Sequence, residues 1–177
     1  RTLDAMRRLH EITSDRQATI DTKAERILRL GCEIFNLPIG IISHIVDEQY
    51  TVRFTLNPEN ALKPGDNFQL GNTYCSETIA GCHAVAHHHV GDSETQHHPA
   101  YANFGLESYL AAPLFLKDKL YGTINFSGPE PRSRAFSTGE IELIQLFAKW
   151  MGDELAREET DNELERDRLL LDAVSKQ

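Results

Sequence analysis

Apolar residues recur every three or four positions near both ends of the chain. This spacing predicts a short helix over residues 3–13, a second helix that ends before Pro38, and a third from Ser137 to the C-terminus. The segments Thr22–Glu25 and Ser137–Glu140 have the form of a capping box, in which a hydroxyl and a carboxylate satisfy free backbone amides at a helix start. We therefore expect the two longer helices to begin at these motifs.

Between the helices the period changes to two. Alternating, β-branched and aromatic residues predict an antiparallel hairpin over residues 38–56. A second pair of strands is predicted over 106–116 and 120–126, on either side of a charged turn. The middle of the chain is therefore expected to form a sheet.

The connection between the two strand pairs, residues 57–105, is unusually long. It is expected to hold one short helix over 70–80, with Asn72 or Thr73 near its cap, and one strand over 83–88. Such length is typical of a segment that covers a ligand cavity, and the alternative is a lid that packs only on itself. The candidate ligand-binding residues are Phe68, Leu70, Tyr74, Cys75, His87, His89, Asp92, His97, Tyr101, Phe104, Tyr109 and Asn125.

The last predicted helix is longer than a domain of this size can cover. Its first part has a full apolar face up to Leu155, residues 156–163 are polar, and a thin stripe of Leu164, Leu171 and Val174 follows. At 1.5 Å per residue the segment would extend over roughly 50 Å. We expect its second half to leave the globule and pair with the same helix of a second subunit, with a disordered tail as the alternative.

Charge and cysteine content narrow the possible partners. The 177 residues include 27 Asp and Glu against 18 scattered Lys and Arg, a formal net charge of -9, so we expect no nucleic acid. Cys32, Cys75 and Cys82 are odd in number and form no CxxC pair, which indicates a reducing compartment and predicts a cytoplasmic location. No apolar run approaches the roughly 18 residues of a membrane helix, so no membrane segment is expected.

Histidines are the most conspicuous candidate metal ligands. They cluster at 87–89 and 97–98, and neutral imidazoles bind Zn or Ni. In a strand, however, His87 and His89 would share one face while His88 pointed to the other. We expect no metal, and keep as an alternative a site built from His88, His89, His97 and His98.

Catalytic signatures are absent from the sequence. Cys75 follows Tyr74 on the predicted short helix, and no base that could activate it is readable nearby. The sequence has no P-loop, no GxSxG and no GxGxxG motif. We therefore expect no catalytic residues in this chain.

Taken in order, five segments resemble the GAF domain family over about residues 20–155. They are Cys32–Ser43 (CEIFNLPIGIIS), Leu70–Ile79 (LGNTYCSETI), His97–Leu114 (HHPAYANFGLESYLAAPL), Leu120–Ser127 (LYGTINFS) and Phe136–Glu140 (FSTGE). The resemblance implies an α+β, PAS-like fold with a central antiparallel sheet of five or six strands. It places the N- and C-terminal helices on one face of the sheet and a loop-covered cavity on the other.

The same resemblance implies a function. It is strongest to GAF domains of bacterial sensor histidine kinases and cyclic-dinucleotide signalling proteins, which implies a non-catalytic sensory domain that binds a small ligand. We expect residues 1–19 to form a connector helix, 20–155 the sensory domain, and 156–177 a signalling helix leading to an output domain. The expected partners are a second copy through the terminal helices, that output domain and an unidentified small molecule. The alternatives are a metal or redox sensor using the histidines and Cys75, and a structural dimerisation module with a collapsed cavity.

Activities known in the GAF family can be compared with this sequence. Bilin-binding members carry a Cys shortly before the strand matching 106–116, where this chain has His97, His98 and Tyr101, so covalent bilin is not expected. The free methionine sulfoxide reductases of the family use several cysteines around the cavity. In this chain only Cys75 falls near one of those positions. In the cyclic-nucleotide signature, Phe126 and Gly139 replace the Lys and an acidic residue. Haem would need an axial ligand such as His87, His89 or His97. No cofactor is therefore required.

Overall fold

The computed structural model describes residues 2–177 and confirms the predicted α+β fold. Its centre is a six-stranded antiparallel sheet with the strand order β3-β2-β1-β6-β5-β4. The strands are β1 (Ile39–Val46), β2 (Gln49–Leu56), β3 (Asn67–Gln69), β4 (Val85–His87), β5 (Ser108–Leu116) and β6 (Lys119–Gly128).

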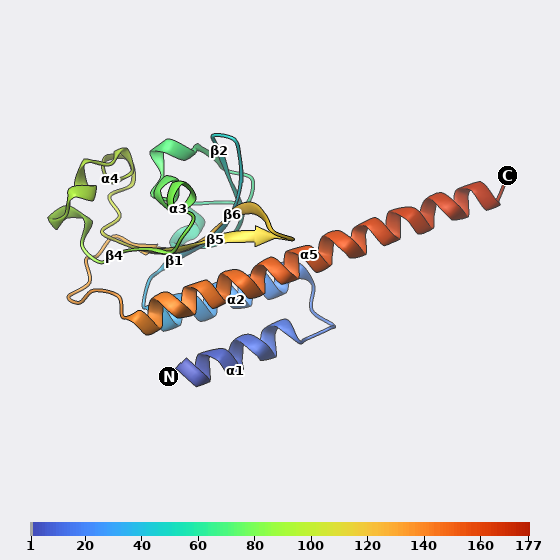
Figure 1. The fold of residues 1–177 in the computed structure, drawn as a ribbon, viewed down its shortest axis with the longest axis horizontal. Helices are drawn as coiled ribbons and strands as arrows, with labels where there is room; N and C mark the ends of the chain where they lie inside the picture. The colour runs from blue at the N-terminus through green and yellow to red at the C-terminus, as the bar shows by residue number, and fades with distance from the viewer. Residues whose placement is uncertain (1) are drawn as a thin grey trace.

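The helices lie in layers on both faces of this sheet (Figure 1). On one face lie α2 (Ile20–Phe35) and α5 (Thr138–Ser175), and α1 (Thr2–Thr13) packs against both. The other face is covered by the long connection, which contains α3 (Cys75–Gly81), α4 (Pro99–Phe104) and four 3-10 turns. The turns are η1 (Pro58–Asn60), η2 (Leu70–Asn72), η3 (Val90–Asp92) and η4 (Glu94–His97). The terminal helices therefore share one face, as expected.

The main core fills the space between the sheet and α2 and α5. Phe126 of β6 is fully buried there, with its ring centroid 5.3 Å from that of Phe35 and 6.3 Å from that of Phe147. Gly31 of α2 permits this packing, because a Cβ at that position would lie 2.1 Å from the Phe126 ring. Burial of such side chains is worth roughly 1.5–3 kcal/mol each, so this layer dominates the stability of the fold.

The two predicted capping boxes have different outcomes. At the start of α5, Ser137 Oγ accepts a hydrogen bond from the Glu140 N–H, and the Glu140 carboxylate accepts one from the Ser137 N–H, which confirms that box. The prediction at Thr22 was wrong, because α2 begins three residues earlier. Thr19 is its N-cap, and its hydroxyl accepts from the Thr22 N–H at 3.2 Å.

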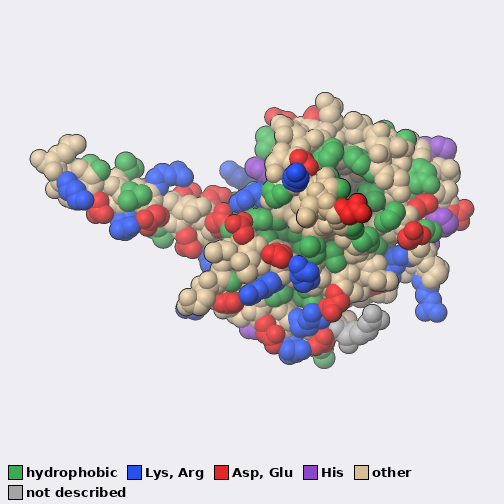
Figure 2. Space-filling model, turned by 180° about the vertical axis from the view of Figure 1, so that it is seen from behind, with side chains coloured by type: hydrophobic (Ala, Val, Ile, Leu, Met, Phe, Trp, Pro, Cys, Tyr) green, Lys and Arg blue, Asp and Glu red, His purple; other side chains and the backbone are tan. Residues whose placement is uncertain are grey.

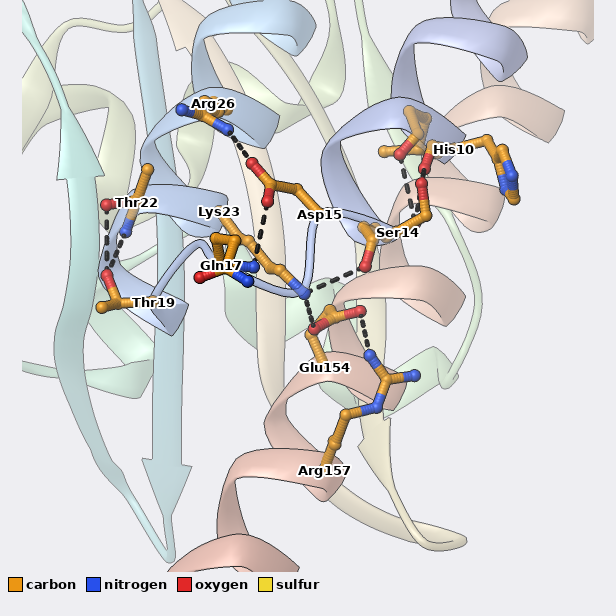
Figure 3. Close-up of polar contacts among 12 residues, drawn as sticks. His10, Ser14, Asp15, Gln17, Thr19, Thr22, Lys23, Arg26, Glu154 and Arg157 are labelled. Atoms are coloured by element: carbon orange, nitrogen blue, oxygen red, sulfur yellow. Dashed lines mark hydrogen bonds and ion pairs between the residues drawn. The ribbon is translucent and has the colours of Figure 1, made fainter.

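A buried ion pair joins the start of α2 to α5 (Figure 3). Lys23 Nζ lies 3.0 Å from Glu154 Oε2 and donates to the Thr13 carbonyl at 2.9 Å. Arg157 donates to the other carboxylate oxygen of Glu154 at 2.8 Å. Because Thr13 ends α1, this contact set fixes all three helices of the layer to one another.

Beyond this contact, α5 extends away from the globule (Figures 1 and 2). Every side chain from residue 159 to 177 is exposed. Charged groups of both signs and several hydrophobic side chains lie along this extension. No helix within residues 2–177 is both long enough and apolar enough to span a bilayer.

Candidate ligand-binding site

The floor of the candidate site is the sheet face opposite α2 and α5. Side chains alternate along a strand, so Thr123, Asn125 and Ser127 of β6 point away from the core residues Ile124 and Phe126. These three polar residues are almost completely buried, with at most 3% of their surface exposed. Buried polar side chains on a central strand need partners, and a network around Cys75 supplies them for Thr123 and Asn125.

A β-bulge in β2 brings Tyr50 into the same floor. In the pairing with β1, Ile42 is opposite Phe54 but Ser43 is opposite Val52, so Arg53 is an extra residue. The bulge places Phe54 in the helix-side core, whereas Tyr50 and Val52 belong to the cluster on the opposite face.

The roof of the site is formed by the segment between β2 and β5. Cys75 begins α3 above the centre of the sheet, and the preceding Tyr74 is fixed by a 2.9 Å hydrogen bond from its hydroxyl to the Leu106 carbonyl. The prediction of one helix over 70–80 was wrong in detail, because η2 and α3 are separate. The N-cap of α3 is Tyr74, the residue after Thr73, and the Tyr74 side chain makes no capping hydrogen bond to the helix.

A cavity of about 270 Å³ lies between this floor and roof. Seven aliphatic or phenylalanine side chains, three tyrosines and four small polar or thiol side chains surround it. In the described chain these are Ile39, Ile41, Tyr50, Ala61, Leu62, Phe68, Thr73, Tyr74, Cys75, Phe104, Leu106, Tyr109, Asn125 and Ser127. An apolar pocket with a few convergent polar groups is the usual form of a small-molecule site.

Larger hollows occur elsewhere but have a different character. One of about 540 Å³ and one of about 810 Å³ lie near the start of α5, and both are lined by Arg132 and Arg134. Arg132 is already paired with Glu140 at 3.2 Å and lies over the Phe136 ring. The smaller cavity is the better candidate because its apolar walls meet buried polar groups.

Cys75 lies at the centre of the polar network beneath the cavity. Its sulfur is 3.2 Å from Thr123 Oγ1, and the Tyr109 hydroxyl donates to it at 3.1 Å. The Asn125 amide nitrogen lies 3.4 Å from the same sulfur and 3.2 Å from the Tyr50 hydroxyl. The network joins β2, β6, β5 and α3, so the floor and roof of the cavity are held as one unit.

Burial keeps the groups of this network neutral. It raises the pKa of the Cys75 thiol, although hydrogen bonds from Thr123 and Tyr109 act in the opposite direction. Burial also raises the pKa of Tyr50 and of Tyr109 well above the usual value for a phenol. The groups bonded to Cys75 are hydroxyls and an amide, none of which is a base that could form a thiolate. Cys75 is therefore held as a neutral thiol that contacts hydroxyl and amide groups.

Six of the twelve predicted ligand-binding residues line the cavity. These are Phe68, Tyr74, Cys75, Phe104, Tyr109 and Asn125. Leu70 is buried in the same cluster without lining the space. His87, His89, Asp92, His97 and Tyr101 lie in the roof segment outside the lining.

Eight lining residues were not predicted. They are Ile39, Ile41, Tyr50, Ala61, Leu62, Thr73, Leu106 and Ser127. For Ser127 the alternation along β6 from Asn125 was a readable signal. The position of Tyr50 could not be predicted, because strict alternation would place Tyr50 and Phe54 on the same face of the sheet and the bulge at Arg53 separates them.

Among the clustered histidines, His87 and His98 have side-chain partners elsewhere in the fold. The expectation that His87 and His89 share one face of a strand does not apply, because β4 ends at His87 and His89 lies just before η3. His87 Nε2 lies 3.1 Å from Glu77 Oε2. His98 Nδ1 accepts from the Ala100 N–H at 3.0 Å as the cap of α4, and its Nε2 lies 3.0 Å from Ser76 Oγ. Across the described residues, no group of three or more His, Cys, Asp or Glu side chains is arranged to hold a metal ion.

Comparison with known families decides the classification. The family model for the GAF domain matches residues 19–155, most of the chain. The chain belongs to the GAF domain family. GAF domains are typically sensory or regulatory domains of signalling proteins, although the fold also occurs in a methionine sulfoxide reductase. No curated protein matched the chain.

Solved GAF structures resemble this one throughout. The GAF domain of an Acinetobacter phosphoenolpyruvate-protein phosphotransferase is 16% identical, with a TM-score of 0.72 over 92% of this chain and 97% of that one. The phycocyanobilin-bound GAF domain of a cyanobacterial phytochrome is 17% identical, with a TM-score of 0.67 over 91% and 97%. Free methionine-R-sulfoxide reductase from Neisseria meningitidis, in complex with its substrate, is 13% identical, with a TM-score of 0.68 over 89% and 90%. At these identities the likeness shows the fold alone.

Proposed function

We propose that this GAF domain is a non-catalytic, cytoplasmic regulatory module of a bacterial signalling protein, such as a sensor histidine kinase or a cyclic-dinucleotide enzyme. A small molecule occupies the cavity, and its presence changes the packing of α5. The observation that carries this proposal is that β5 and β6 bear cavity residues on one face and α5 contacts on the other. Tyr109 and Asn125 line the cavity, while their neighbours Leu110, Ile124 and Phe126 belong to the helix-side core.

The bulge in β2 provides a second connection between the cavity and α5. Tyr50 lines the cavity, and Arg53, three residues along the same strand, donates to Glu158 Oε1 at 3.1 Å. The other oxygen of Glu158 is buried without a partner among the described residues. Glu158 lies on α5 just before the exposed extension begins. A shift of β2 on ligand binding would therefore reach α5 at its exit from the globule.

The extension of α5 is proposed to pair with that of a second copy. Leu164, Leu171 and Val174 are 63–70% exposed and repeat at coiled-coil spacing. An isolated helix of this length is marginally stable in water, so burial of this stripe against an identical helix would stabilise it. The paired helices would then connect to an output domain.

Two other functions have less support. A structural dimerisation module with a collapsed cavity conflicts with the open space of about 270 Å³ beneath the roof. A metal or redox sensor would need converging ligands or a second thiol near Cys75, and the geometry of the histidines and of Cys32 and Cys82 offers neither among the described residues.

The proposal is tested by weighing a retained ligand. Protein purified from its own host is analysed by native mass spectrometry, beside Leu62→Trp, which fills the cavity from the roof, and Val46→Trp, a matched change at a residue 55% exposed and outside the lining. We expect an added small-molecule mass on the wild type and on Val46→Trp, and its loss from Leu62→Trp. Equal retention by all three proteins, or none by any, would contradict ligand binding in this cavity.

A further inference from the structure

We propose that the ligand is an uncharged, compact, mainly aromatic molecule with one hydrogen-bond-donating head, such as a phenol or an aromatic alcohol. This inference rests on the proposed function and specifies the chemistry of the same cavity. Three observations carry it, namely the absence of charge in the lining, the unused acceptor on Asn125, and the size and aromatic character of the walls.

The first observation concerns charge. Of the fourteen lining residues in the described chain, none is an acid or a base that would be ionised at neutral pH. The nearby carboxylates are engaged elsewhere. Glu77 pairs with His87 at 3.1 Å, and Glu107 accepts from the Gly91 N–H at 2.6 Å and from the Tyr101 hydroxyl at 3.3 Å. A charged ligand would lose its hydration without gaining an opposite charge, so the cavity discriminates strongly against it.

The second observation concerns Asn125. Its side chain is 3% exposed, and its Nδ2 contacts the Tyr50 hydroxyl, Thr123 Oγ1 and Cys75 Sγ. Its Oδ1 accepts no hydrogen bond from any other described residue, although Asn125 lines the cavity. This oxygen is not fully enclosed by protein atoms, so an O–H or N–H group of a ligand in the cavity could donate a hydrogen bond to it. The ligand head is therefore a donor.

The third observation concerns size and walls. At about 270 Å³ the cavity is slightly smaller than the roughly 300–1,000 Å³ usual for ligand pockets, which favours a compact ligand. Aromatic rings form the walls, with Phe68 and Phe104 at a centroid distance of 5.5 Å and Tyr74 and Tyr109 at 5.3 Å, both edge to face. The parts of these rings that face the cavity favour packing against the ring of an aromatic ligand.

The test uses four benzene derivatives of nearly equal size. They are benzyl alcohol (neutral donor), benzaldehyde (neutral acceptor), benzoate (anion) and benzylammonium (cation), titrated into protein refolded from urea to remove any host ligand. Binding is followed by saturation-transfer NMR. Leu62→Trp and Ser127→Leu, which fill the cavity from roof and floor, identify binding at this site. Thermal unfolding confirms that both variants fold.

We expect benzyl alcohol to bind most tightly, benzaldehyde about fivefold more weakly for lack of the donor, and the two ions at least ~30-fold more weakly. Both filling variants should abolish binding. Tighter binding of either ion, equal binding of the aldehyde, or failure of all four probes would overturn the inference. A ligand mass retained by host-purified protein would in that case leave the proposed function standing, and the absence of such a mass would remove both.

Discussion

The ammonium group of Lys23 lies 3.0 Å from the carboxylate of Glu154, and both side chains are more than nine-tenths buried. The pair joins α2 to α5 within four residues of Glu158, where the cavity-bearing strand β2 also contacts α5. The helix is therefore held by buried charge at the point where it leaves the globule. Loss of Lys23 would leave the buried Glu154 carboxylate with only Arg157, whose side chain is 59% exposed, as a charged partner, which is unfavourable.

Replacement of Lys23 by Met should lower the free energy of unfolding by about 3 kcal/mol, because Glu154 would stay buried and lose its one buried charged partner, keeping only the exposed Arg157. Urea denaturation measures the change. The control is Lys149→Met, which breaks a pair with Asp153 whose side chains are 70% and 58% exposed, and should cost no more than ~0.5 kcal/mol. The double variant Lys23→Met with Glu154→Leu should recover much of the loss. If Lys23→Met and Lys149→Met lowered the free energy of unfolding equally, the buried pair would stabilise the fold no more than an exposed pair does.

Substitution of Gly152 should also have a large effect on stability. A Cβ at this position in α5 would lie 2.3 Å from the backbone carbonyl oxygen of Phe115 at the end of β5. Gly152→Ala should therefore lower the free energy of unfolding by about 2 kcal/mol or more, although alanine is the better helix former. Gly139→Ala, in the first turn of the same helix with nothing nearer than 3.8 Å, should cause no loss. Stabilisation by Gly152→Ala would refute the close packing of α5 on the sheet.

The neutral Cys75, Tyr50 and Tyr109 side chains around the cavity predict a loss of stability in alkali. Burial raises the pKa of Cys75, Tyr50 and Tyr109 in the folded chain, so the unfolded chain ionises first. Their contribution is complete below the ordinary thiol and phenol values of 9.0 and 10.0 and is lost as the pH rises past them, by up to ~1.4 kcal/mol per pH unit for each group. Urea denaturation between pH 8 and 11 measures the slope.

Two variants test whether the loss of stability at high pH comes from the buried groups around Cys75. Tyr109→Phe removes one buried phenol and should make the decline with pH shallower, whereas Cys82→Ser changes an exposed thiol and should leave the decline as it is. A free energy of unfolding that stays constant to pH 11 would contradict the assignment of these groups as neutral and buried.

The exposed stripe of α5 predicts a dimer. Leu171→Glu should weaken self-association at least tenfold, because it places a charge in the paired apolar seam. Leu169→Glu, at a residue of similar exposure outside the spacing of Leu164, Leu171 and Val174, should have little effect. Sedimentation velocity over a range of concentrations measures both. A wild-type chain that remains monomeric at high concentration would exclude pairing through this helix.

The layers of the fold could be predicted from the sequence because local patterns determine them. The period-two runs located β1, β2, β5 and β6, and the Ser137–Glu140 box located the start of α5. The capping error at Thr22 arose because Thr19, also a hydroxyl residue, lies three positions earlier. A local motif cannot decide between two adjacent caps of similar quality.

The cavity could be predicted only in part, because it depends on contacts between distant segments. Phe68, Tyr74 and Phe104 were found because aromatic residues in a long connection indicate cavity walls, whereas Tyr101 from the same set lies outside the lining. Tyr50 was missed because the face of the sheet on which it lies depends on the bulge at Arg53. No residue type in the sequence predicts this bulge. His87 was included as a ligand-binding residue and His98 as a possible metal ligand, but Glu77 and Ser76 are their partners in the fold.

Hydrogen exchange of α5 residues 156–163 tests most directly whether the cavity communicates with the exit of this helix. Exchange is compared by mass spectrometry between host-purified protein and the same protein after removal of its ligand by unfolding and refolding. We predict a change in protection of this segment in the wild type, and a much smaller change in Arg53→Gln, which loses the contact to Glu158. Identical exchange in the ligand-bound and ligand-free wild type would contradict the account.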